Sequence, residues 1–277
     1  GWVLMDLRSW SWPPIMESQG IGSTLTIKSP GDGMKANPSI INLFSDQLPN
    51  RLNCDVAIIG SGAGGAMAAQ ILSSAGLDVI VLEQGPYKTS GSFKGLEKVA
   101  YPDLYQDAGA RKTSDKAISI LQGRAVGGGT TVNWTTSIRT PDKTLNYWQQ
   151  RFGLKGLTSS TLLPWFEDIE KQLNIHTWSM PPNENNAVLK KGCEKLGWEY
   201  TPIRRNVKHC ANLGYCGMGC PINAKQSMLV TAIPAALKQG ARLLTHAYVN
   251  KLVFDRHKIK SIQVLGCDDK FHPDLNR

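Results

Sequence analysis

The sequence lacks the features that mark several common protein classes. No stretch of its 277 residues approaches the ~18 consecutive apolar residues of a membrane-spanning helix, so none is a transmembrane candidate. No internal repeat or low-complexity tract is present, which argues against a repeat architecture. No DNA- or RNA-binding motif occurs, so we expect no nucleic-acid partner. These absences leave contact with a membrane surface open.

Charge and apolar content favour an ordinary folded protein. Lys and Arg number 31 against 22 Asp and Glu, which gives a net charge of +9. The basic residues lie in short scattered clusters, so we interpret them as a solvated surface rather than a binding patch. A hydrophobic fraction of 41% is enough for a sizeable core, in one large domain or two.

The first candidate binding motif along the sequence is a glycine-rich turn. The run 55–59, apolar after Asp55, predicts a strand. Gly60-Ser61-Gly62-Ala63-Gly64-Gly65 follows it, and small residues then predict a helix over 63–75. Such a turn lets a pyrophosphate approach the backbone at a helix N-terminus, where N–H groups and the helix dipole favour an anion. We therefore expect Gly60, Gly62, Ala63 and Gly65 to bind a dinucleotide.

An acidic residue follows at the spacing that a ribose requires. The run 79–82 predicts a second strand, which ends at Glu83, roughly 20 residues after the glycines. A carboxylate there can accept hydrogen bonds from a ribose diol and would repel a 2′-phosphate. The segment Asn53–Pro86 thus predicts a βαβ unit with parallel strands, but Glu83 does not distinguish NAD from FAD.

A second glycine-rich loop, Gly123–Asn133, makes that distinction through a resemblance. With Arg124 after its first glycine, a glycine pair and small hydroxyl residues before Asn133, it resembles the signature loop of the glucose–methanol–choline (GMC) oxidoreductases, which are FAD-dependent alcohol oxidases and dehydrogenases. In that family the loop lies against the flavin. The resemblance covers about Asn53–Gly266 and implies an FAD site that adds to the first turn the following residues: Arg124, Gly128, Gly129, Asn133, Thr136 and, through its backbone, Val249.

Three of the six cysteines form a compact motif, Cys210-x5-Cys216-x3-Cys220-Pro221, among several glycines. Three thiolates can hold an iron–sulfur cluster, and Cys-Pro also ends the ligand run of bacterial ferredoxins. The segment resembles the loop of bacterial FAD glucose dehydrogenase subunits that holds a 3Fe-4S cluster, and this resemblance implies a cluster here. It also resembles a loop of long-chain alcohol oxidases, and that resemblance does not imply one. A zinc site with His209, a disulfide and a metal-free structural loop remain alternatives.

These features predict a mixed α/β fold, a Rossmann-like FAD-binding domain with the start of a substrate domain. We expect an irregular N-terminal arm over 1–50, the FAD-binding unit and flavin loop over 51–145, a substrate-domain portion with the Cys loop over 146–220, and a return to the FAD-binding domain over 221–277. Helices are expected over 160–173, 185–196 and 224–239, and strands over 242–244, 247–254 and 259–265.

The expected function is oxidation of an alcohol or sugar CH–OH group by hydride transfer to FAD, with oxygen or an electron carrier as the acceptor. Long-chain alcohol oxidation with oxygen is one alternative, and an NAD-binding Rossmann protein with a structural zinc loop is another. None of the five His residues lies in a catalytic context, so we name no catalytic residue. We expect the chain to be the N-terminal portion of a longer protein, with the catalytic base in the remainder.

Overall fold

A computed structural model describes residues 23–27, 39–45, 51–268 and 270–274 of the chain. It divides the chain into two compact units. The first contains residues 1–133, 213–223 and 227–277, and the second contains 134–212 and 224–226. Cys216 and Cys220 of the Cys loop belong to the first unit.

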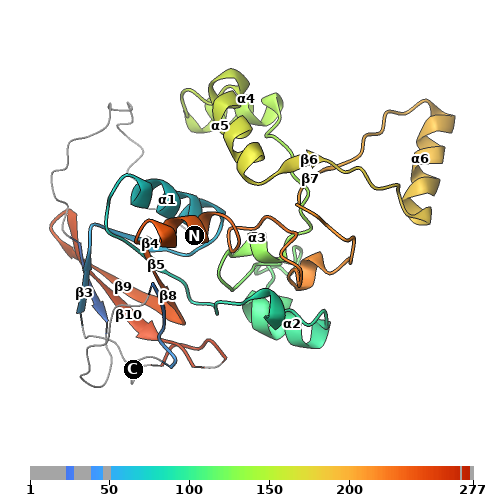
Figure 1. Ribbon diagram of the computed structural model, residues 1–277. Helices are drawn as coiled ribbons and strands as arrows, with labels where there is room; N and C mark the ends of the chain where they lie inside the picture. The colour runs from blue at the N-terminus through green and yellow to red at the C-terminus, as the bar shows by residue number, and fades with distance from the viewer. Residues whose placement is uncertain (1–22, 28–38, 46–50, 269, 275–277) are drawn as a thin grey trace. The chain divides into compact units, whose positions relative to one another are not determined.

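The first unit contains a parallel sheet with the strand order β2-β8-β5-β4 (Figure 1). Its strands are Ile40–Asn42 (β2), Val56–Ile59 (β4), Val79–Leu82 (β5) and Arg242–Thr245 (β8). All neighbouring pairs run parallel. The helix α1, Ala63–Ser74, connects β4 to β5 and confirms the predicted βαβ unit.

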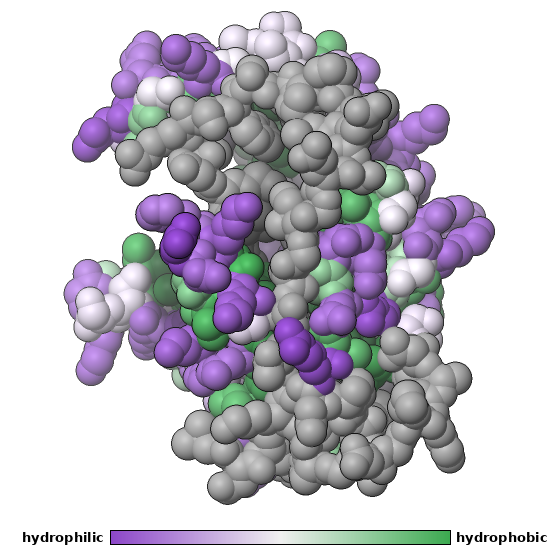
Figure 2. Space-filling view, turned by 90° about the vertical axis from the view of Figure 1, so that its left-hand side faces the viewer, coloured by the Kyte–Doolittle hydropathy of each residue, from purple (hydrophilic) through white to green (hydrophobic). Residues whose placement is uncertain are grey.

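A second sheet of the same unit has the order β3-β1-β10-β9 and is mixed. It is built from Ser23–Ile27 (β1), Arg51–Cys54 (β3), Ala247–Asp255 (β9) and Lys258–Gly266 (β10). The parallel β1–β10 pair is the exception among antiparallel neighbours. In Figure 2, purple hydrophilic and green apolar side chains lie side by side around the residues drawn in grey.

The core of the first unit lies between the two sheets. Buried side chains from both contribute to one cluster, among them Ile80, Leu82 and Leu244 of the parallel sheet and Ile262 and Val264 of the mixed sheet. Helix α7, Ala232–Lys238, packs beside α1 and completes a helical layer. Shorter elements follow β5 and precede α7: Ser90–Ser92 (η1), Glu97–Leu104 (α2), Gln106–Gly109 (η2), Gly129–Val132 (α3) and Cys216–Met218 (η3).

The second unit is mainly helical. Its elements are Asp142–Phe152 (α4), Ser159–Gln172 (α5), Ile175–Thr177 (β6), Glu184–Leu196 (α6) and Arg204–Asn206 (β7). Local signals set two of the helices: Thr158 caps α5 by accepting from the Thr161 N–H, and Gly197 ends α6 in the left-handed conformation. Both helices agree with the sequence-based expectation.

Three expectations about secondary structure need correction. Residues 23–27 and 40–42 are strands, so the interpretation of 1–50 as an irregular arm is wrong for these two segments; the remaining part of 1–38 and 46–50 lies outside the described residues. The helix expected over 224–239 begins only at Ala232. Pro234 then lies in its first turn, where the missing N–H costs nothing, rather than in a kink. Helix α4 was not predicted.

Candidate FAD site

The first glycine turn connects β4 to α1 at the carboxyl edge of the parallel sheet. Gly60 adopts a φ of +89°, which favours glycine, and its N–H donates to the carbonyl of Leu82 at 2.7 Å. A side chain at Gly65 would overlap the Gly60 carbonyl oxygen, so helix and strand approach closely only because Gly65 has none. These two glycines shape the turn itself.

Two other glycines of the turn face open space. A Cβ atom at Gly62 or at Gly64 would meet no atom within 4 Å. Gly62 is the N-cap of α1, and the first turn of that helix, which starts at Ala63, carries no acidic side chain. The backbone is therefore accessible at a helix N-terminus, which is the arrangement that binds a phosphate or pyrophosphate.

Glu83 follows β5 and is 7% exposed. Its Oε2 accepts hydrogen bonds from the backbone N–H (3.0 Å) and from the hydroxyl (2.6 Å) of Ser61, and its Oε1 accepts from the Gly85 N–H at 2.9 Å. The carboxylate predicted to bind a ribose thus also fixes the glycine turn. With one N–H donor on Oε1, that oxygen has a further lone pair that a ribose hydroxyl can use.

The second glycine loop lies directly against the first. The Gly127 N–H donates to the Ser61 hydroxyl oxygen at 3.0 Å. Gly128 has a φ of +53°, and a Cβ atom there would lie 2.8 Å from the Cα of Gly62. Gly129 begins the short helix α3, which ends before the exposed Asn133. Two segments more than sixty residues apart therefore form one cradle.

Arg124 has partners away from the glycine turns. Its guanidinium lies 4.5 Å from the ring centre of Phe271 and donates to the Pro102 carbonyl at 3.0 Å. Burial lowers the pKa of Arg124, and its Nε is buried without a hydrogen-bond partner.

The last two predicted contacts, Val249 and Thr136, belong to other segments of the chain. Val249 is on β9, opposite Val264, and packs against the core cluster; β9 begins at Ala247, whose N–H donates to the Glu83 carbonyl at 2.9 Å. Thr136 is exposed and belongs to the second unit. The structure thus unites the glycines and Glu83 in one unit and assigns Thr136 to the other.

Sequence reasoning missed two buried polar residues at the same edge of the sheet. Ser61 is fully buried between the glycines, and its only sequence signal is a hydroxyl within the turn. His246 follows β8 and stacks on Phe271 at 5.1 Å between ring centres. Burial, with a smaller effect of Lys88, lowers the pKa of His246, and its Nδ1 has no partner. No signal in the sequence indicated that His246 is a buried ring with an unpaired nitrogen.

The predicted metal site gains no support. In the part of the chain that the structure describes, no group of three or more His, Cys, Asp or Glu side chains could hold a metal ion. Cys216 and Cys220 belong to the first unit and Cys210 to the second, and no cysteine forms a disulfide. The loop is instead anchored by its backbone, because the Tyr105 hydroxyl donates to the Gly217 carbonyl at 2.6 Å.

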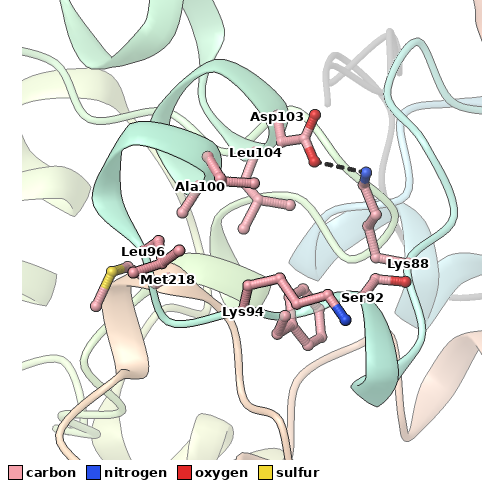
Figure 3. A pocket seen from close by; sticks show the side chains of 10 residues that line it. Lys88, Ser92, Lys94, Leu96, Ala100, Asp103, Leu104 and Met218 are labelled. Carbon is pink, nitrogen blue, oxygen red and sulfur yellow. Dashed lines mark hydrogen bonds and ion pairs between the residues drawn. The ribbon is translucent and has the colours of Figure 1, made fainter.

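A small pocket is lined by helix α2, the segment before it and Met218 (Figure 3). Its charged groups already have partners: Lys88 Nζ lies 2.7 Å from Asp103 Oδ2, and Lys94 donates to the Gly91 carbonyl. The remaining wall is largely apolar, so we assign the pocket no chemistry. Among the described residues, no helix is long and apolar enough to cross a bilayer.

Comparison with known proteins agrees with this geometry. The family described as GMC oxidoreductase matches residues 101–272, more than half of the chain, and the FAD binding domain matches residues 53–99. Long-chain-alcohol oxidase FAO4B of Arabidopsis thaliana is 37% identical over 73% of this chain and 27% of its own length. The uncharacterized GMC-type oxidoreductase Rv0492c of Mycobacterium tuberculosis is 34% identical over 80% of this chain and 36% of its own length.

Solved structures show the same fold. Pyridoxine 4-oxidase from Mesorbium loti superposes with a TM-score of 0.56 at 19% identity, over 77% of this chain and 46% of that one. Formate oxidase superposes with a TM-score of 0.50 at 16% identity, over 76% and 41%. The chain thus spans about a quarter to a third of the two curated relatives named above, which are 27% and 36% covered.

Proposed function

The chain belongs to the GMC oxidoreductase family, and from this premise we propose that the protein oxidises the CH–OH group of a small-molecule alcohol with FAD as cofactor. The observation that carries the proposal is the cradle in which Gly62 and Gly128 meet while the space beside Gly62 and Gly64 stays open. An NAD-binding Rossmann protein is the weaker candidate, because the matched domain is one that binds FAD.

The residues of the cradle suit the parts of FAD. In this proposal the N–H groups at Gly62, Ala63 and Gly64 hold the pyrophosphate, and Oε1 of Glu83 accepts a hydrogen bond from the ribose. The loop at Gly128–Asn133 lies against the flavin, with Thr136 and the Val249 backbone as further contacts. Bound FAD supplies the acceptor for a hydride from the alcohol carbon.

Proton removal from the alcohol requires a base. We propose that it lies in the part of the whole protein outside this sequence, because the chain spans only 27% and 36% of the two relatives named above. The name of the Arabidopsis relatives favours a long-chain alcohol as substrate and oxygen as acceptor. A dehydrogenase that reduces an electron carrier is the alternative.

The test is flavin content followed by turnover. The full-length protein should show flavin absorbance after purification and should consume oxygen with a long-chain primary alcohol. Turnover with an artificial acceptor but no oxygen consumption would favour the dehydrogenase. Purified protein that neither contains nor takes up FAD would refute the proposal.

We propose that residues 213–223 are a structural loop rather than a cluster ligand set. The anchoring bond from Tyr105 and the tight packing of Gly219 on Phe93 support this role. Anaerobically purified protein should then lack iron and acid-labile sulfide, and Cys216→Ser should leave flavin in place. Stoichiometric iron that Cys216→Ser removes would restore the cluster hypothesis.

A further inference from the structure

One buried hydroxyl connects three segments of the candidate site. Ser61 is fully buried, and its Oγ lies 2.6 Å from Oε2 of Glu83 and 3.0 Å from the backbone nitrogen of Gly127. These partners are 22 and 66 residues away in the sequence. The first glycine turn, the acid after β5 and the second glycine loop thus share a single oxygen atom.

The direction of each bond follows from the donors available. The Gly127 N–H can only donate, so the Ser61 oxygen accepts from it and the single hydroxyl proton goes to Glu83. The backbone N–H of Ser61 donates to the same Oε2 at 3.0 Å. Both donors of Ser61 therefore hold one carboxylate oxygen, and the other, Oε1, faces Gly85 with a lone pair remaining.

We infer that Ser61 is a positioning residue for FAD: its hydroxyl fixes the rotamer of Glu83 and docks the second glycine loop onto the first. This inference rests on the proposed FAD site. The pyrophosphate, ribose and flavin contacts lie on the three segments that Ser61 joins. Loss of the hydroxyl leaves the Gly127 N–H buried without its acceptor and removes the charge-assisted bond to Glu83.

The chain offers a matched control in Ser73. This serine is also buried in the first unit, at 3% exposure, but its hydroxyl donates to the carbonyl oxygens of Ala69 and Gln70 in its own helix. Ser61→Ala and Ser73→Ala therefore each remove one buried, hydrogen-bonded hydroxyl. Only the first change breaks contacts between separate segments of the site.

The primary measurement is FAD affinity of the full-length protein, stripped of flavin and titrated by flavin fluorescence. Ser61→Ala should raise Kd roughly 10- to 100-fold, the effect of one lost hydrogen bond to a charged group, and Ser73→Ala should leave it unchanged. Ser61→Gly also removes the hydroxyl. It is a second variant and should raise Kd as Ser61→Ala does.

Two further readouts separate positioning from general destabilisation. In flavin-free protein, hydrogen exchange of the segment 123–133 should be faster in Ser61→Ala than in Ser73→Ala. In a double-mutant cycle, Ser61→Ala with Glu83→Ala should raise Kd less than the product of the two single effects, because both act on one bond. An unchanged Kd in both Ser61 variants, or fully multiplicative effects of Ser61→Ala and Glu83→Ala on Kd, would overturn the inference. The proposed function would still stand in either case if the wild-type protein binds FAD.

Discussion

Because the space beside Gly62 is open, we predict that a mutation at this position changes FAD affinity much more than it changes the stability of the fold. Gly62 has φ −67° and ψ −169°, which any residue adopts, and its absent Cβ would touch nothing within 4 Å. For Gly62→Ala the poorer N-cap and the reduced entropy of the unfolded chain are opposing terms of about 0.5–1 kcal/mol each. The free energy of unfolding of the flavin-free protein should therefore change by less than about 1 kcal/mol.

FAD affinity should respond very differently to the same change. A methyl group at Gly62 occupies the space through which a pyrophosphate would reach the backbone N–H groups of the turn. Each charge-assisted hydrogen bond lost is worth about 1.5–3 kcal/mol, so Kd should rise roughly 10- to 100-fold for every bond that is broken. Flavin fluorescence titration measures the affinity, and thermal unfolding of the flavin-free protein measures the stability.

Two other glycines provide controls for this experiment. Gly65→Ala forces a methyl group onto the Gly60 carbonyl, so stability should fall by about 1–3 kcal/mol or more, as in other overpacked sites. Gly192, in helix α6 of the second unit, also faces open space, and Gly192→Ala should leave FAD affinity unchanged. If Gly62→Ala binds FAD as tightly as the wild-type protein, the pyrophosphate does not lie at this turn.

Three further predictions concern the anchoring of the Cys loop, an ion pair and the activity of the chain alone. Tyr105→Phe, which removes the bond to the Gly217 carbonyl, should lower the free energy of unfolding by about 1 kcal/mol and speed proteolysis within 213–223; unchanged proteolysis would contradict the anchoring role. Hydrogen bonds from Arg139 and Arg204 lower the pKa of Glu170 from 4.5 to about 2, so its stabilising effect should be present above about pH 4.5 and disappear as the pH falls toward 2. Because both arginines are 38% exposed, Glu170→Gln should cost about 1 kcal/mol at pH 7 and flatten the unfolding profile between pH 2 and 4.5; a profile like that of the wild type would refute this. The 277-residue chain alone should show no alcohol turnover even with flavin bound, because loss of a general base costs about 10²–10⁴ in rate; robust turnover would place the base among its own residues.

The part of the fold that the sequence predicts well is local. A short apolar run, glycines at fixed spacing and a helix of small residues follow one another within thirty residues, so β4, α1 and β5 need no distant partner to be recognised. Helices α5 and α6 carry their own start and stop signals in Thr158 and Gly197. Each of these signals depends on backbone geometry within one element.

The part that the sequence does not predict depends on distant partners. Strand β1 pairs with β10, more than two hundred residues later, and β2 pairs with β8 at a similar separation. Segments of five and three residues have too little pattern to be identified without those partners. The start of α7 has a different cause: a proline near the beginning of an apolar pattern fits a kink and a first turn equally well. Only the non-helical turn over residues 228–231, which precedes the helix, decides between them.

Ser61 shows why a motif can locate a site without identifying the residues that organise it. The glycine fingerprint constrains the positions where a side chain is forbidden, since Gly65 and Gly128 are set by close backbone approach. The fingerprint allows any residue at position 61, because this position requires a side chain that both donates and accepts a hydrogen bond, not the absence of a Cβ. That demand arises only when Glu83 and the Gly127 N–H converge on one buried oxygen. The glycines thus bring the loops within reach of each other, and the serine between them determines how they are held.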